Sequence, residues 1–280
     1  MRWQDLVVVG VVVAAGCGRS GVISFADEYA DAWPTEDPIV DRCDAVDYLF
    51  VIDNSASMAD NQRKLIDNYA TFIDEVERSL ETVDSLHVGV ITTDIYQGNT
   101  PECRRLGGLV VSTAGQSSSN EECGPYADGF NFMTEEDDLQ DAFACAAQVG
   151  ISGSIQEAPL TAASLAIDGM LTEEGECNEG FIRDDALLVV VVLTDEDEPE
   201  AGARLSEAMT NAKLGYRDNA VLVAIVNEVG GPCGAEGKAA LETIALAKSL
   251  EHGFVGSICE ADFSPAFARA VDVVKEACGQ

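Results

Sequence analysis

The run Asp53-Asn54-Ser55-Ala56-Ser57 has the residue types and the spacing of a cation-binding site. In extended backbone alternate side chains point to the same side, so Asp53, Ser55 and Ser57 can direct three oxygen atoms to one point. Carboxylate and hydroxyl oxygens suit hard divalent cations, Mg²⁺ or Ca²⁺, with Mn²⁺ as a third candidate. The same residues could instead cap the helix that follows, because Asp and Ser are strongly preferred at helix N-termini.

A second carboxylate, Asp195, is expected to meet this run. It follows the apolar segment 187–193, just as Asp53 follows the apolar segment 48–52. Ligands of parallel α/β sheets bind at the carboxyl ends of the strands, so both acids should reach one edge of the sheet. Further acids near that rim, Asp94, Glu196, Asp197 and Glu198, are predicted to be mainly solvated, with a place around the cation as the alternative.

The segments that must position these residues alternate between two patterns. Short continuous apolar runs predict strands that are buried on both faces of a parallel sheet. Longer stretches with apolar residues three and four positions apart predict amphipathic helices. The predicted strands are residues 48–52, 86–92, 186–193, 220–226 and, more weakly, 253–258, and the predicted helices are residues 65–80, 139–149, 160–171, 204–214, 238–250 and 263–278.

This alternation predicts one α/β domain over residues 47–280. Its expected core is a doubly wound, mostly parallel central sheet with helices on both faces, stapled by disulfides. Segment 97–128 breaks the rhythm, since it is rich in Ser, Gly and Asn and holds Cys103 and Cys123. We interpret it as an insertion that is pinned by a disulfide, with a short strand at residues 109–112 inside it.

An Asp-x-Ser-x-Ser run after the first strand, with a further Asp after a later central strand, resembles the von Willebrand factor type A (VWA) family and its metal-ion-dependent adhesion site. By the order of strands and helices, the resemblance covers residues 47–279. It implies a Rossmann-like fold and a divalent cation held by Asp53, Ser55, Ser57 and Asp195. It also implies binding of a protein or other ligand, as an adhesion or scaffold module, through an acidic group that meets the cation's open position.

The chain departs from the family where a loop before a helix normally supplies a threonine. The matching stretch, residues 153–160, has no threonine ahead of its helix, and Glu157 falls nearest that position, with Ser154 as the alternative. Asp53 and Asp195 already neutralise a divalent cation, so a third carboxylate would leave the site negative and poor at capturing an acid. Two interpretations follow. In the first, Glu157 lies outside the coordination sphere of the cation. In the second, the site holds its cation in a structural role and favours Ca²⁺. A third interpretation is an exposed residue at a helix N-terminus, stabilised by the helix dipole.

The first residues indicate export. The apolar run 6–15, preceded by Arg2, is too short to span a bilayer comfortably and predicts a signal peptide of residues 1–16. The run ends in small residues before Cys17, which resembles the lipobox of bacterial lipoproteins, and residues 17–46 would then carry the lipid and form an acidic tether. We expect a lipoprotein of the bacterial cell envelope, in the outer membrane, that touches the membrane only through its lipid. An ordinary signal peptide with an incidental cysteine is the alternative.

Charge and composition narrow the functional classes. The formal net charge of -34 excludes nucleic acid as a partner and is compatible with divalent cations or a basic partner. No enzyme is expected, because the two histidines, His87 and His252, stand far from the motifs and offer them no general base. A hydrolase with Asp53 as nucleophile is disfavoured, since that chemistry usually has a second acid where this chain has Ser55. The alternative to a metal-dependent binding module is a structural or assembly lipoprotein with the same fold.

The nine cysteines are an odd number, and assigning Cys17 to the lipid leaves an even set for disulfides. An oxidising compartment favours such structural bridges. Sequence alone does not settle their connectivity. From the positions of the predicted elements we expect the pairs Cys43–Cys278, Cys103–Cys123, Cys145–Cys177 and Cys233–Cys259.

Overall fold

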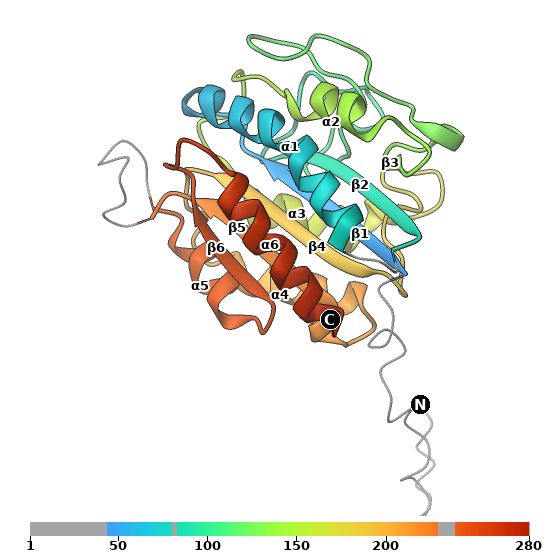
Figure 1. The fold of residues 1–280 in the computed structure, drawn as a ribbon. Helices are drawn as coiled ribbons and strands as arrows, with labels where there is room; N and C mark the ends of the chain where they lie inside the picture. Colours follow the sequence, from blue (N-terminus) through green and yellow to red (C-terminus); the bar gives the residue numbers. More distant parts are fainter. Residues whose placement is uncertain (1–43, 80–82, 229–238, 280) are drawn as a thin grey trace, which may run out of the picture. The chain divides into compact units, whose positions relative to one another are not determined.

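Six β-strands form a central sheet in the computed structural model, in the order β3-β2-β1-β4-β5-β6 (Figure 1). The structure describes residues 44–79, 83–228 and 239–279, all within one compact unit that spans residues 37–280. Neighbouring strands are parallel except β2 and β3, which are antiparallel. The strands are β1 (Ala45–Ile52), β2 (Ser85–Thr92), β3 (Met133–Thr134), β4 (Leu187–Thr194), β5 (Ala220–Val226) and β6 (Gly253–Ser257).

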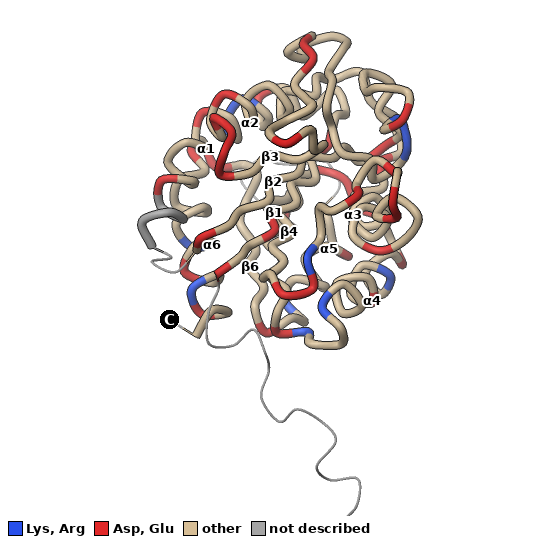
Figure 2. Tube along the Cα trace, turned by 90° about the vertical axis from the view of Figure 1, so that its right-hand side faces the viewer, with Lys and Arg blue, Asp and Glu red and all other residues tan. Residues whose placement is uncertain are grey.

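Helices cover both faces of this sheet. Helices α1, α2 and α6 lie on one face and α3, α4 and α5 on the other, with the sheet as the middle layer (Figures 1 and 2). The predicted doubly wound α/β architecture is therefore confirmed. The helices are α1 (Ala59–Ser79), α2 (Leu139–Ala147), α3 (Pro159–Ile167), α4 (Gly202–Ala212), α5 (Leu241–Ser249) and α6 (Ser264–Ala277), and the short 3-10 turns are η1 (Ala56–Met58), η2 (Ala127–Gly129), η3 (Met170–Thr172) and η4 (Arg217–Asn219).

The sheet is apolar on both faces because helices cover both. Every residue of β4 and of β5 is buried, as expected for central parallel strands. On the α1 side the core is aromatic: the ring of Phe50 lies 4.8 Å from that of Phe143 and 5.8 Å from that of Tyr69, measured between centroids. Burying each such ring contributes roughly 1.5–3 kcal/mol, so the strands are held firmly where their carboxyl ends meet.

The connections of the chain diverge at β1 and β4. These two strands are adjacent and parallel, in register from Val46 opposite Leu187 to Ile52 opposite Leu193. The chain leaves β1 towards α1 on one face and leaves β4 towards α4 on the other (Figure 1). Where neighbouring strands send their connections to opposite faces, the loops separate and leave room for a ligand at the carboxyl edge.

The insertion after β2 differs from its prediction in two respects. Residues 109–112 form no strand, although Ser112 makes an isolated bridge with Glu122. Strand β3 was not predicted, because two residues at the antiparallel edge leave no periodic pattern.

The disulfides of the insertion connect it to segments outside it. Cys103 pairs with Cys177 and Cys123 pairs with Cys145, so the predicted pairs Cys103–Cys123 and Cys145–Cys177 are wrong. The prediction assumed that the insertion closes on itself, whereas it packs against α2 and against the segment that leads into β4. Cys259 and Cys278 are also disulfide-bonded.

Several predictions about the ends of the chain lie outside the described residues. These are the signal peptide, Cys17, nearly all of the tether, and the cysteines Cys43 and Cys233, so the pairs Cys43–Cys278 and Cys233–Cys259 stay predictions. In the part of the chain that the structure describes, no helix is long and apolar enough to cross a membrane.

The amino-terminal edge of the sheet contains a buried ion cluster around Asp47. Arg183 donates through Nε to Asp47 Oδ1 (2.8 Å) and through its backbone N–H to Asp47 Oδ2 (2.9 Å). The Nζ atom of the buried Lys213 lies 3.7 Å from Asp47 Oδ2 and donates to the carbonyl oxygen of Arg183 (2.6 Å). The cluster holds the segments before β4 and after α4 against the start of β1, at the end of the strands opposite Asp53 and Asp195.

Candidate functional site

Asp53 is the first residue after β1 and is fully buried. Its backbone N–H donates to the carbonyl oxygen of Leu193 (3.0 Å), which fixes it against the end of β4. Its Oδ1 accepts the backbone N–H of Ser55 (2.8 Å) and its Oδ2 accepts the hydroxyl of Thr194 (2.6 Å). Burial raises the pKa of Asp53 and Asp195 adds to the rise, while the hydrogen bonds from Thr194 and Ser55 oppose it.

The two serines place their hydroxyls side by side. Ser55 Oγ and Ser57 Oγ are 3.1 Å apart. Ser55 stands at the cap position of η1, yet its side chain makes no capping hydrogen bond, so the helix-cap alternative does not account for this serine. The short turn η1 thus presents two hydroxyl oxygens next to the carboxylate of Asp53.

Asp195 follows β4 directly and brings a second carboxylate to this edge. Its side chain is largely buried, at 8% exposure, and its Oδ1 has no hydrogen-bond partner among the described residues. Burial raises the pKa of Asp195, a hydrogen bond with Ser57 lowers it, and the neighbouring Glu196 raises it. Through Ser57 the loop after β1 therefore contacts the loop after β4.

Glu157 lies just before α3 and is also only 8% exposed, so its interpretation as an exposed helix-start residue is wrong. Thr93 donates a hydrogen bond to its Oε2, whereas its Oε1 has no partner within the described part of the chain. Burial raises the pKa of Glu157 to about 8, and Asp53, Asp94 and Glu196 act in the same direction. A carboxylate in this position is costly unless a cation or a proton neutralises it.

Ser154, the alternative to Glu157 as a site residue, uses its side chain for a hydrogen bond within its own loop. Its Oγ accepts the backbone N–H of Gln156 (3.0 Å) and its backbone N–H donates to Asp94 Oδ2 (2.8 Å). The preceding Gly153 lies so close to Asn54 that a Cβ would come within 2.6 Å of it. Glycine at this position lets the loop before α3 approach the loop after β1.

The predicted ligands contain the donor types that a hard cation needs, although they do not form a dense cluster of carboxylates. They are Asp53, Ser55, Ser57 and Asp195. Among the described residues, no three His, Cys, Asp or Glu side chains come together as a metal-binding group. Two carboxylates and two hydroxyls nevertheless meet at one strand edge, and Asp195 and Glu157 each keep one buried oxygen without a hydrogen bond. Oxygen donors of this kind, with capacity left over, fit Mg²⁺ or Ca²⁺.

Three of the four acids at the rim, which were predicted to be mainly solvated, are half-buried and accept hydrogen bonds from the protein. Asp94 accepts hydrogen bonds from Asn54, Thr92 and Ser154. Asp197 accepts the backbone N–H of Glu242 (2.9 Å) at the start of α5. Glu198 accepts the backbone N–H groups of Leu160 (2.8 Å) and Thr161 (3.1 Å) in the first turn of α3. Carboxylates at helix N-termini are favoured by the helix dipole, so Asp197 and Glu198 help to fix the starts of α5 and α3.

Two residues that the sequence analysis did not single out support the site. Gln62 donates through Nε2 to the carbonyl oxygens of Asp53 (3.0 Å) and Gly150 (2.8 Å), which joins α1 to the loops. Thr93 directly follows β2, as Asp53 directly follows β1. Its position could therefore have been predicted from the rule that functional groups gather at the carboxyl ends of the strands. Gln62 gives no such signal, since it is one polar residue on a long helix.

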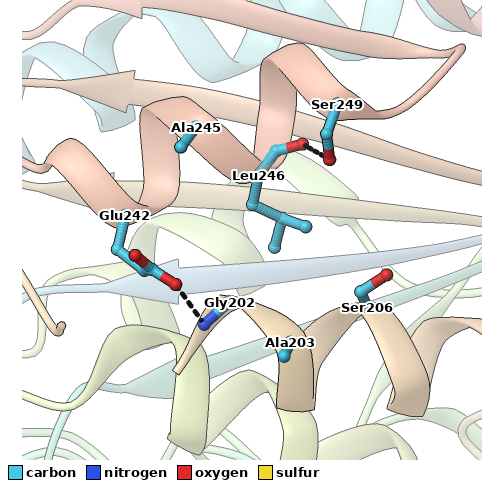
Figure 3. Close-up of a pocket in the computed structure, with 7 residues that line it drawn as sticks. All are labelled: Gly202, Ala203, Ser206, Glu242, Ala245, Leu246 and Ser249. Carbon is cyan, nitrogen blue, oxygen red and sulfur yellow. Dashed lines mark hydrogen bonds between the residues drawn. The ribbon is translucent and has the colours of Figure 1, made fainter. Parts of the chain in front are cut away.

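A groove between α4 and α5 lies on the sheet face opposite α1. Small side chains line most of it, and its one charged lining residue, Glu242, accepts the backbone N–H of Gly202 (3.1 Å) (Figure 3). Because that carboxylate joins the two helices, the groove offers fewer available polar groups than the carboxyl edge of β1 and β4.

Comparison with known proteins assigns the chain to no family. No protein-family model matches the chain, and no curated protein matches it. A solved structure of proximal thread matrix protein 1 (PTMP1) from the mussel byssus is similar over 84% of this chain, at 16% sequence identity and a TM-score of 0.45. The chain spans about half of that structure, 48% of its length.

Proposed function

We propose that this protein is a metal-dependent binding module of the VWA type. The observation that carries the proposal is the meeting of Asp53 and Asp195 at the ends of adjacent parallel strands, beside the paired hydroxyls of Ser55 and Ser57. The strand order supports it, because these residues lie where the connections of β1 and β4 leave to opposite faces, the place at which parallel α/β sheets bind ligands.

Asp53, Ser55, Ser57 and Asp195 would hold the cation, Mg²⁺ or Ca²⁺, with Mn²⁺ as a substitute. Bound there, the ion would neutralise two buried carboxylates and offer a coordination position to a partner. Glu157 stands beside these residues, either as a further ligand or as a group that acts on the ion from outside its coordination sphere.

The site serves binding rather than catalysis in this proposal. Both oxygens of Asp53 are engaged, by Ser55 and by Thr194, which disfavours a nucleophilic role. His87 is at the other end of the strands, where its Nδ1 lies 2.8 Å from the carbonyl oxygen of Phe181 and 3.6 Å from Asp47. It is therefore badly placed as a general base for Asp53.

The proposed setting is the bacterial envelope. The small residues before Cys17 support export and lipidation, with the outer membrane as the destination and the lipid as the sole membrane contact. The partner in this proposal is a protein or another envelope ligand.

Calorimetric titration of the purified protein with Mg²⁺, Ca²⁺ and Mn²⁺ tests the cation. We expect saturable binding of at least one ion, and its loss in Asp53→Ala without loss of the fold, because Asp53 lies at a strand end. Asp272→Ala, which removes an exposed carboxylate from α6, is the matched control and should bind as the unaltered protein does. Absence of binding in the unaltered protein, or equal binding in Asp53→Ala, would favour the structural or assembly lipoprotein instead.

A further inference from the structure

Two isoleucines stand exposed beside the candidate site. Ile155 is 95% exposed and Ile95 is 52% exposed. Ile155 directly follows Ser154, and Ile95 directly follows Asp94. The backbone N–H of Ser154 donates to Asp94 Oδ2 (2.8 Å), so the two isoleucine side chains project from neighbouring loops. Exposed aliphatic side chains on neighbouring loops, with polar groups around them, can form part of a surface that a partner covers.

The loops that carry these isoleucines are held in place. Asn54 donates through Nδ2 to Asp94 (3.2 Å), and Gly153 donates its backbone N–H to the carbonyl oxygen of Asn54 (2.9 Å). The loops after β1 and β2 and the loop before α3 are thereby joined at one point. The apolar patch formed by Ile95 and Ile155 consequently has a fixed place relative to Asp53.

The charges around this patch are acidic. The charged groups that raise the pKa of Glu157 by like-charge repulsion are Asp53, Asp94 and Glu196. The basic residues on the nearby first turns of α1 are engaged elsewhere. Arg63 pairs with Asp60, while Lys64 donates to the carbonyl oxygen of Glu260 (2.8 Å) and lies over the ring of Phe263.

Glu157 supplies an independent observation. It is a nearly buried carboxylate whose Oε1 has no hydrogen-bond partner among the described residues. Asp53 and Asp195 already balance the charge of a divalent cation, so Asp94 and Glu196 leave the surroundings negative even when an ion is bound and Glu157 is protonated. An approaching carboxylate would meet like charge, which lowers both affinity and association rate.

We propose that this rim binds a protein segment that places a Lys or Arg beside an aliphatic side chain, and not the acidic group that the family resemblance implies. The aliphatic side chain packs on Ile95 and Ile155, and the basic group faces Asp94 and Glu196. The inference rests on the proposed function only in using the same edge of the sheet. The net charge of the whole chain, -34, favours encounter with basic partners.

Selection of displayed random peptides on the purified protein tests this inference, in buffer with Ca²⁺ and in buffer with chelator. We expect enrichment of peptides that pair Lys or Arg with Leu, Ile or Val. Their binding should weaken as salt is added, because exposed charges are screened. The double variant Ile95→Ser/Ile155→Ser should lose about tenfold or more in affinity, since an aliphatic contact is worth about 1.4 kcal/mol or more. Met170→Ser, which changes an equally exposed residue (71%) beyond the far end of α3, is the control and should bind normally.

The outcomes separate this inference from the proposed function. Enrichment of acidic peptides, no enrichment at all, or equal binding by the isoleucine variant would overturn the inference. Basic peptides that bind equally with and without chelator, to a protein that takes up no cation, would support the inference and count against the metal site. Cation uptake together with selection of acidic peptides would support the metal site and overturn the inference.

Discussion

Glu157 shows how one residue can couple the site to pH. Its pKa is raised from 4.5 to about 8, chiefly by burial, so the folded protein holds this proton more tightly than the unfolded chain does. Between these two pH values the folded state binds more protons, and stability therefore falls as pH rises from about 4.5 to about 8. Below pH 4.5 both states are protonated, and the effect disappears.

Glu157→Gln should remove much of this pH dependence when cations are chelated. A pKa difference of one corresponds to about 1.4 kcal/mol, so the variant should be more stable than the unaltered protein by a few kcal/mol at pH 8.5 and by much less at pH 4.5. Urea unfolding at several pH values measures this, with Glu251→Gln, an exposed acid, as the control. Parallel pH curves for the unaltered protein and Glu157→Gln would show that the carboxylate is not buried as described.

Individual site residues were predictable to different degrees. Asp53 and Asp195 could be placed at one edge because each follows an apolar run, and the serines follow from alternation along an extended segment. The burial of Glu157 could not be predicted, because it results from three loops that meet through Asp94 and Asn54. The roles of Asp197 and Glu198 at helix starts were missed for the same reason: their partners are distant in the sequence.

At the scale of elements, continuous apolar runs located the parallel strands well. The predicted strand 48–52 lies within β1, and 220–226 coincides with β5. Parallel central strands are buried on both faces, so their sequences differ sharply from the flanking loops. The short antiparallel strand β3 depends on tertiary contacts, and so does the packing of the insertion against segments outside it. Neither feature leaves a comparable pattern in the sequence.

The two disulfides of the insertion should differ in their contribution to stability. Cys103–Cys177 spans 74 residues of sequence and Cys123–Cys145 spans 22. In the chain-entropy model the longer loop contributes roughly 4 kcal/mol and the shorter roughly 3 kcal/mol, both upper figures. Cys103→Ala/Cys177→Ala should therefore lower the melting temperature more than Cys123→Ala/Cys145→Ala. Calorimetry of both double variants, with peptide mapping of the remaining bridges, checks this, and the reverse order would mean that native contacts outweigh the loop effect.

For the whole molecule, strand order and charge constrain function together. The order β2-β1-β4-β5 brings residues 141 positions apart, Asp53 and Thr194, into one hydrogen bond. The strong negative charge is compatible with the proposed cation site and with the proposed basic partner. Alternation of strands and helices sufficed to predict this architecture, because few topologies satisfy the rules of right-handed crossover.

Anomalous diffraction from crystals grown or soaked with Mn²⁺ tests the central claim most directly. The account predicts one strong anomalous peak at the carboxyl edge between β1 and β4, within coordinating distance of Asp53, Ser55, Ser57 or Asp195. That peak should be absent from crystals of Asp53→Ala prepared in the same way. A map without a peak at this edge, or with its strongest peak at another group of residues, would contradict the metal site and the function built on it.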